Sequence, residues 1–401
     1  MVIEGFQVQL AGRVVAHLYA RGDHTWLEWQ QGYWDDPDRP VLGLFFEDQP
    51  SRRVASALRL PPWFSNLLPE GRLRQWVARD AGVNEQREMR LLVRLGNGLP
   101  GAVVITPVDG QDDPVWRPED TLPPQLPSPD DGLLHFSLAG VALKFSLLQE
   151  GDRLTLPAGD RDGDWIVKMP DAVYPEVPAN EFAMMTLAGL CGIDVPEIRL
   201  WHRDDLPTLP DAAWPKGQEW AYAVRRFDRN RRIHVEDLAQ VRNFYPEDKY
   251  RGSFETAAAL IHRRWDEKSY LEFVRRLFFS FAIGNGDMHL KNISLIYRDP
   301  RRPVISPAYD LVSTAPYLND PEDLGLKLGR SRRFEEVFPE SFELLARRVG
   351  APVGETMDAV ARVAGNLEGA WAQTSQLLKP LPRHRSWLDR RIPEVARRFS
   401  G

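Results

Sequence analysis

Hydrophobic and polar residues alternate loosely from Gln7 to Leu18, and Ala11-Gly12-Arg13 interrupts the alternation near its middle. A period of two predicts half-buried strands, and a short break containing glycine predicts a hairpin between them. We therefore expect a hairpin here and a third short strand over Thr25–Trp29. A helix that follows Pro69 and ends at Ala81-Gly82 comes next, and a buried strand follows at Gly101–Ile105.

A proline-rich stretch then interrupts the pattern. Seven prolines lie between Thr106 and Gly132, among Asp, Gln and Ser residues, a composition that disfavours both helix and sheet. We interpret it as an interdomain linker. The predicted organisation is a domain over 1–107, a linker over 108–131 and a core over 132–401.

The core begins with short alternating runs and becomes helical. Expected strands are 134–136, 142–148, 165–169 and 220–227, with a helix at about 179–191, and from about Ser253 the pattern is helical apart from one hairpin. The predicted fold class is therefore α+β, with a small mixed α/β lobe at about 132–228 and a helical lobe at about 229–401, preceded by an α/β N-terminal domain.

The sharpest local signal is the polar stretch Gly284–Asn292, which follows an apolar helical face. After it come two β-prone runs, 293–297 and 304–306, that predict a hairpin. Because a hairpin brings its ends together, Asn292 and Asp310 should be neighbours in space.

An Asp, an Asn five residues later and a second Asp after a hairpin are typical of phosphoryl-transfer loops. In that interpretation Asp287 is the base that accepts the proton of the attacking hydroxyl, and Asn292 and Asp310 hold Mg²⁺. A polar turn with local side-chain capping would give the same pattern, so the loop alone leaves both interpretations open.

Upstream residues favour the catalytic interpretation. Lys168 ends an apolar strand-like run, where burial requires an anionic partner, although the side chain could instead extend to the surface. Glu181 lies on the apolar face of the next helix and is the natural partner of Lys168; a carboxylate favoured by the helix dipole is the alternative. Ser137-Leu138-Ala139-Gly140 is a weak candidate for a phosphate-binding turn.

Composition narrows the setting. Lys and Arg number 51 against 57 Asp and Glu, a net charge of -6 that argues against a protein whose whole surface binds nucleic acid. The single cysteine, Cys191, excludes an intramolecular disulfide and fits a reducing compartment. No apolar run approaches a membrane span, and the start of the chain lacks the basic residues of a signal peptide. We expect a cytoplasmic protein without a membrane partner.

Taken together, these stretches resemble the HipA-type serine/threonine kinases, the toxins of type II toxin–antitoxin pairs, over nearly the whole length. The motifs that carry the resemblance are 64–71, 99–102, 137–144, 166–170, Asn180-Glu181, 226–229, 284–292 and 309–313. Two stretches depart from it: this chain has Ala142-Leu143 where relatives commonly have Gln and an acidic residue or Pro, and Arg225 where they often have Glu.

The resemblance implies a two-lobed, protein-kinase-like core and assigns roles in it. It implies Asp287 as the catalytic base, Asn292 and Asp310 as Mg²⁺ ligands, and Ser137 as a serine whose autophosphorylation switches the kinase off. It also implies a nucleotide site for ATP made of Ser137, Ala139, Gly140, Lys168, Glu181, Phe227, His289 and Tyr309.

The implied partners are a small HipB-like helix-turn-helix antitoxin, DNA reached through that antitoxin, and a protein substrate in translation such as an aminoacyl-tRNA synthetase. Arg383, Arg385 and the other C-terminal arginines could touch phosphate in such a complex, but a solvated helix face explains them as well. A small-molecule kinase and a catalytically weak pseudokinase that acts as a corepressor remain alternatives.

Overall fold

The structure, a computed structural model, describes residues 3–108, 143–150, 153–155, 163–209, 211–229, 231–318 and 323–400. The chain forms two compact units. Unit 1 comprises residues 1–135, 228–249 and 294–303, and unit 2 comprises residues 136–227, 250–293 and 304–401. Two stretches that the sequential division assigns to the core, 228–249 and 294–303, thus cluster with the N-terminal region.

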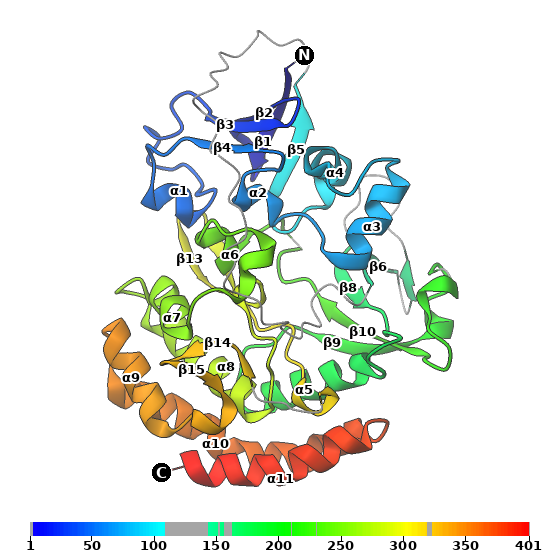
Figure 1. Ribbon diagram of the computed structural model, residues 1–401, viewed down its shortest axis with the longest axis vertical. Coiled ribbons are helices and arrows are strands. Elements are labelled where there is room, and N and C mark those ends of the chain that lie inside the picture. Colours follow the sequence, from blue (N-terminus) through cyan, green and yellow to red (C-terminus); the bar gives the residue numbers. More distant parts are fainter. Residues whose placement is uncertain are drawn as a thin grey trace. The chain divides into compact units, whose positions relative to one another are not determined.

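Unit 1 is built on a five-stranded antiparallel sheet with the order β4-β3-β2-β1-β5 (Figure 1). Its strands are β1 (Glu4–Leu10), β2 (Arg13–Arg21), β3 (His24–Trp29), β4 (Val54–Ala57) and β5 (Val103–Pro107). The predicted hairpin at Ala11-Gly12 is confirmed. Both residues have positive φ, 51° and 79°, which gives the twist that two-residue hairpin turns favour.

Short helices complete the N-terminal part of unit 1: α1 (Leu44–Asp48), α2 (Pro62–Ser65), α3 (Gly71–Asp80) and α4 (Glu88–Leu95). Apolar residues from the sheet and from these helices form one core, including Val8, Leu18, Trp63 and Leu92. The helix expected after Pro69 is α3.

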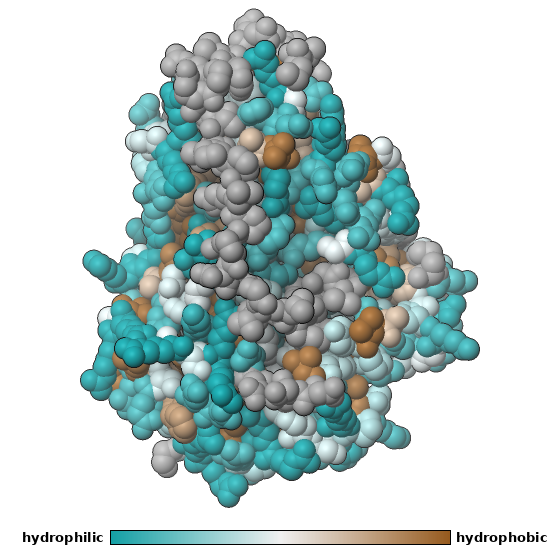
Figure 2. All heavy atoms as spheres, in the orientation of Figure 1, coloured by the Kyte–Doolittle hydropathy of each residue, from teal (hydrophilic) through white to brown (hydrophobic). Residues whose placement is uncertain are grey.

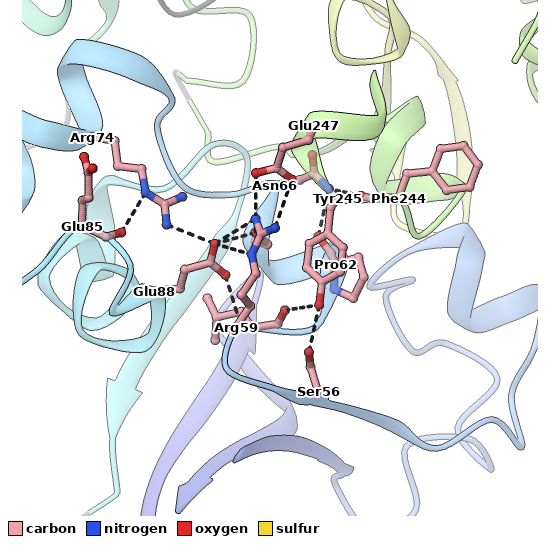
Figure 3. Close-up of polar contacts among 12 residues, drawn as sticks. Ser56, Arg59, Pro62, Asn66, Arg74, Glu85, Glu88, Phe244, Tyr245 and Glu247 are labelled. Atoms are coloured by element: carbon pink, nitrogen blue, oxygen red, sulfur yellow. Dashed lines mark hydrogen bonds and ion pairs between the residues drawn. The ribbon is translucent and has the colours of Figure 1, made fainter. Parts of the chain in front are cut away.

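A buried carboxylate, Glu88, organises the polar contacts of this region (Figure 3). It accepts hydrogen bonds from the guanidinium groups of Arg59 and Arg74, both at 3.1 Å, from the Ser65 hydroxyl at 3.1 Å and from the backbone N–H of Leu60 at 3.0 Å. With two cations and two neutral donors, the buried charge is fully compensated. Arg59 also reaches Glu247, so the same cluster ties residues 244–247 to the N-terminal part.

The segment 228–249 is bound into unit 1 by residues of the N-terminal motifs. It contains β11 (His234–Asp237) and α6 (Leu238–Val241), followed by the 3₁₀ helix η5 (Pro246–Tyr250). The backbone N–H of Gly101 donates to Asp228 at 2.8 Å, and the carbonyl of Gly101 accepts from Arg229 at 2.9 Å. A Cβ at Gly101 would lie 2.8 Å from the backbone nitrogen of Val235, so this close approach requires glycine.

Strand β11 pairs with β12 (Ser294–Asp299) in a three-stranded sheet that ends with β13 (Arg302–Ile305). β12 and β13 form the predicted hairpin, but the strands extend further than expected and leave only Pro300 and Arg301 in the turn. The Asp299 carboxylate explains the tightness, because it accepts the backbone N–H of Arg301 at 2.8 Å.

Unit 2 contains a second antiparallel sheet with the order β7-β6-β8-β10-β9. Helix α5 (Val177–Leu190) packs against β9 and β10. The other elements are β6 (Lys144–Glu150), β7 (Arg153–Thr155), β8 (Trp165–Lys168), β9 (Ile198–His202) and β10 (Trp220–Arg225). The strands expected at 142–148, 165–169 and 220–227 and the helix expected at 179–191 are confirmed within a few residues, whereas that at 134–136 lies outside the described residues.

The rest of unit 2 is helical, as predicted, around the long buried helix α8. Its elements are α7 (Phe254–His262), α8 (Glu267–Ala282), α9 (Pro339–Val349), α10 (Val353–Thr374) and α11 (Pro382–Phe399). Phe278, Phe342 and Phe399 pack ring against ring between α8, α9 and α11. A second hairpin, β14 (Asp323–Leu328) and β15 (Ser331–Arg333), was not predicted.

The surface is largely hydrophilic on the face in Figure 2, where hydrophobic residues form separate small patches. Among the described residues, none of the helices is both long and apolar enough to span a lipid bilayer. Cys191 is buried at the end of α5, and burial raises the pKa of its thiol to about 12.

Candidate functional site

The polar loop that follows α8 is held in a specific conformation. Gly284 has φ +65°, and a Cβ there would lie 2.4 Å from the Trp387 ring of α11. The Thr314 hydroxyl accepts the N–H of Gly286 at 2.7 Å and donates to the carbonyl of Gly284 at 3.2 Å. Glycine at 284 therefore satisfies both the backbone conformation and the close packing.

Asp287 lies in this loop, with only 5% of its surface exposed. The Asn285 side chain accepts the backbone N–H of Asp287 at 2.9 Å, and the amide of Asn292 donates to the Asp287 carbonyl at 2.8 Å. Asp287 and Asn292 are thereby fixed relative to each other by a bond that spans their five-residue spacing. This contact includes the local capping that the polar-turn interpretation predicted, but it leaves the Asp287 carboxylate for other partners.

Two aromatic side chains face that carboxylate. The hydroxyl of Tyr250 donates to Oδ1 of Asp287. The Nε2 atom of His289 lies 4.0 Å from the same oxygen, and the rings of Tyr250 and His289 meet edge to face at 5.0 Å.

Lys168, at the end of β8, lies between two carboxylates. Its Nζ is 2.5 Å from Oε1 of Glu181 on α5, as predicted, and it also bonds Oδ1 of Asp310. Burial lowers the pKa of Lys168 to about 8, while the Glu181 carboxylate acts in the opposite direction. The buried cation is thus compensated by two carboxylates, one 13 and the other 142 positions later in the sequence.

Asp310 follows the hairpin in a left-handed backbone conformation, with φ +57°. The segment after it is fixed to α5, because the side chain of Asn180 bonds both the carbonyl of Ser313, at 2.9 Å, and its N–H, at 3.0 Å. Asp310, Asn292 and Tyr309 line one small cavity of about 10 Å³. The expected proximity of Asn292 and Asp310 is therefore present.

Tyr309 and Phe227 also lie together. Their ring centroids are 6.0 Å apart, and the Tyr309 hydroxyl donates to the carbonyl of Lys291 at 2.9 Å. Arg225, the position that departs from the family pattern, instead bonds Glu197 at 3.1 Å. Ser137, Ala139 and Gly140, expected in the phosphate loop, lie outside the described residues.

The donor atoms present suit Mg²⁺. Because Nδ2 of Asn292 is engaged with the Asp287 carbonyl, the amide oxygen is the Asn292 atom that would bind a cation, and Asp310 in the lining of the same cavity adds a carboxylate. These are the hard oxygen donors that Mg²⁺ prefers, and Mg²⁺ commonly uses few protein ligands together with phosphate oxygens and waters. In the described parts of the chain, no group of three His, Cys, Asp or Glu side chains forms a metal site alone.

Sequence reasoning missed several residues that shape this site. No sequence motif includes Tyr250, and no pattern of neighbouring residues predicts its contact with Asp287, 37 residues later. Arg391 on α11 donates to the carbonyls of Phe281 and Ala282 at 2.7 and 3.0 Å, and so caps the end of α8 directly before the loop. The sequence pattern alone indicates a solvated helix face or a contact with DNA phosphate for the C-terminal arginines, and neither predicts this cap.

The chain is similar to known proteins over most of its length. Residues 6–106 match the family model described as the HipA N-terminal domain, and residues 136–371 match the model described as the HipA-like C-terminal domain. The Y4dM protein of Sinorhizobium fredii is 38% identical, over 97% of this chain and 96% of its own length.

A more distant relative is the serine/threonine-protein kinase toxin HipA of Shewanella oneidensis, 25% identical over 89% of this chain and 85% of that protein. The fold matches the structure of Shewanella oneidensis HipA solved with HipB and operator DNA. The TM-score is 0.74 at 20% identity, and the match covers 98% of this chain and 97% of that one. The likeness supports the expected α+β, kinase-like architecture.

Proposed function

The chain belongs to the HipA family, and from that premise we propose that it is an ATP- and Mg²⁺-dependent protein serine/threonine kinase that acts as the toxin of a toxin–antitoxin pair. One observation carries the proposal: Lys168, Glu181 and Asp310 form a bonded group in the unit that also holds the Asp287–Asn292 loop. A kinase needs these residue types to grip phosphates, hold Mg²⁺ and position an acceptor.

Each residue has a distinct task in the proposed reaction. Glu181 orients Lys168 toward the phosphates of ATP, while Asn292 and Asp310 are the residues that would hold Mg²⁺. When bound, Mg²⁺ would neutralise the charge on the triphosphate. Asp287 accepts the proton of the attacking serine or threonine hydroxyl, and Phe227, Tyr309 and His289 would line the nucleotide pocket.

The central test is Asp287→Asn. It should lower protein phosphorylation from labelled ATP by about 10²- to 10⁴-fold, the usual contribution of a general base, and abolish growth arrest on expression. ATP-dependent thermal stabilisation should persist, because Lys168 and Asp310 remain. Asp299→Asn, in the hairpin turn of β12 and β13, is the matched control and should retain activity.

Three results would contradict the proposal. A toxic Asp287→Asn protein would exclude this mechanism. Turnover of a metabolite without any phosphorylated protein would indicate a small-molecule kinase, and absence of nucleotide-dependent stabilisation in the wild type would indicate a pseudokinase.

Family membership also supports the proposed partners. They are a HipB-like antitoxin, operator DNA reached through it, and a translation protein such as an aminoacyl-tRNA synthetase as substrate. Autophosphorylation of Ser137 would add about -1.5 to -2 charge at the phosphate loop and repel ATP. Mass spectrometry of the wild type and Asp287→Asn tests this: a phosphate on Ser137 in both proteins would point to another kinase.

A further inference from the structure

The environment of the Asp287 carboxylate contains a hydroxyl that the proposed reaction does not use. The phenol of Tyr250 donates its hydrogen bond to Oδ1 of Asp287. In phosphoryl transfer, the attacking hydroxyl makes this same type of contact with the catalytic Asp, because its proton passes to that carboxylate. The Tyr250 hydroxyl therefore stands where an acceptor hydroxyl would be expected.

We propose that Tyr250 closes the acceptor site, so that a substrate hydroxyl must displace the phenol before it can reach Asp287. This inference rests on the proposed kinase function and adds a residue that controls access to it. It concerns the acceptor, since the Tyr250 hydroxyl bonds the carboxylate of Asp287, which would accept the proton of the attacking hydroxyl.

The burial of Asp287 makes its hydrogen bond with Tyr250 an obstacle to an incoming acceptor hydroxyl. Asp287 is almost fully buried, whereas Tyr250 is only partly buried. An incoming hydroxyl thus needs a neighbouring side chain to move. Tyr250 is the neighbour whose oxygen already holds a hydrogen-bonding position on the carboxylate, and its exposed part gives it room to rotate toward solvent.

The backbone around Tyr250 suits such a movement. Tyr250 is the last residue of η5, and Gly252 follows with φ +122°, a conformation that residues with a Cβ rarely adopt. The carbonyl of Tyr250 is anchored, since it accepts from Arg332 of β15 at 2.8 Å. We therefore expect the side chain to rotate about a fixed backbone, without unfolding of the segment.

The test uses the full-length protein with ATP and Mg²⁺ and water as the acceptor, because water needs no identified substrate. Phosphate release from ATP should increase about fivefold in Tyr250→Phe, since a net hydrogen bond of ordinary strength no longer competes for Asp287. Tyr250→Ala removes the ring as well and should increase the rate further. The KM for ATP should stay unchanged in Tyr250→Phe, which keeps the ring against His289.

Tyr270→Phe is the matched control. It removes a buried hydroxyl that bonds Thr356 within the helical part of unit 2, and it should leave phosphate release at the wild-type rate. Asp287→Asn in the Tyr250→Phe background should abolish the increase, which links it to the same carboxylate.

The outcomes separate this inference from the proposed function. If ATP binds and Asp287-dependent turnover is present, but both Tyr250 variants are slower than or equal to the wild type, the phenol does not close the acceptor site. If the wild type neither binds ATP nor shows Asp287-dependent turnover, the kinase function itself is wrong, and the role of Tyr250 falls with it.

Discussion

Glu236 in unit 1 and Glu181 in unit 2 are both buried, with at most 2% of their surface exposed, but different partners hold them. Glu181 bonds a cation, Lys168, which also bonds Asp310. Within the described part of the chain, Glu236 accepts from neutral donors: the backbone N–H of Leu44 at 2.9 Å, the Trp63 indole at 3.2 Å and the hydroxyl of Tyr297.

The different partners of the two buried carboxylates affect how readily each centre is protonated. Burial raises the pKa of Glu236 to about 7, although the three hydrogen bonds act in the opposite direction. The Glu236 carboxyl is thus about half protonated at pH 7, and its hydrogen bonds join β11 to α1, α2 and β12. The centre in unit 2 instead holds the Lys168 cation between the carboxylates of Glu181 and Asp310. A buried cation between carboxylates can exchange one anionic partner for another, which suits a site for phosphates, whereas a carboxyl held by neutral donors suits a structural junction.

Of the variants that test the two centres, Lys168→Met should lower the free energy of unfolding the most. It leaves Glu181 and the nearby Asp310 without their cation, and removing one partner of a buried ion pair typically costs about 3–5 kcal/mol. We expect the free energy of unfolding measured in urea to fall by this amount and ATP-dependent stabilisation to disappear.

A double variant, Lys168→Met with Glu181→Gln, is the control, because it removes the uncompensated carboxylate as well. It should recover much of the lost stability without recovering ATP binding. Equal instability of the single and double variants would show that the charge pairing does not hold this centre together.

The second prediction concerns pH and unit 1. Glu236 has a higher pKa in the folded chain, about 7 against 4.5, so the folded state binds the extra proton between these values. Stability from this group is therefore fully present below pH 4.5 and is lost as the pH rises through 7, by up to about 3 kcal/mol. Glu236→Gln should lack this dependence, so the difference between wild type and variant, followed by urea unfolding from pH 4 to 8, isolates it.

His234 complicates the wild-type curve and provides the control. It lies two residues before Glu236 on β11, and burial lowers the pKa of its ring to about 4. Its unfolded form binds the extra proton, so its contribution to stability is lost as the pH falls from about 6.5 to 4, opposite to that of Glu236. In His234→Gln this opposing contribution is absent, so the net fall in stability with rising pH, which Glu236 causes, should be steeper than in the wild type. A wild-type minus Glu236→Gln difference that stays constant with pH would contradict the assignment.

These two centres also show what the sequence could predict. The Lys168–Glu181 pair followed from periodicity, because an inward carboxylate and an inward lysine on consecutive elements require each other. The proximity of Asn292 and Asp310 followed from a hairpin. Both predictions use residues on elements that follow one another along the chain.

Glu236 and Tyr250 could not be found in this way. β11 has only four residues and carries His234 and Glu236 on its inner face, so its hydrophobic pattern is that of a polar loop. The partners of Glu236 come from 173 to 192 residues earlier and 61 residues later in the chain. The assignment of residues 228–249 to unit 1 depends on these distant contacts, which is why a division read along the sequence placed them in the core.

A smaller effect is expected on ATP binding above pH 8. Lys168 is cationic below its pKa of about 8 and loses its charge above it. ATP affinity should therefore weaken by about tenfold, about 1.4 kcal/mol, between pH 7.5 and 9.5. Thermal shift titrations at each pH measure this, and Lys168→Arg, which stays charged, is the control. Constant affinity in the wild type would exclude Lys168 as the phosphate-binding cation.

The smallest effect should come from the outer part of the Glu88 cluster (Figure 3). The Glu247 side chain is 65% exposed where it bonds Arg59, whereas that of Glu88 is 1% exposed. Solvent screens an exposed ion pair, so Glu247→Gln should cost at most about 0.5 kcal/mol in urea unfolding. Glu88→Gln removes the buried negative charge that two guanidinium groups share and replaces one acceptor oxygen by an NH2 donor, so its cost should be several times larger. Equal costs would contradict the screening of the exposed Arg59–Glu247 pair by solvent.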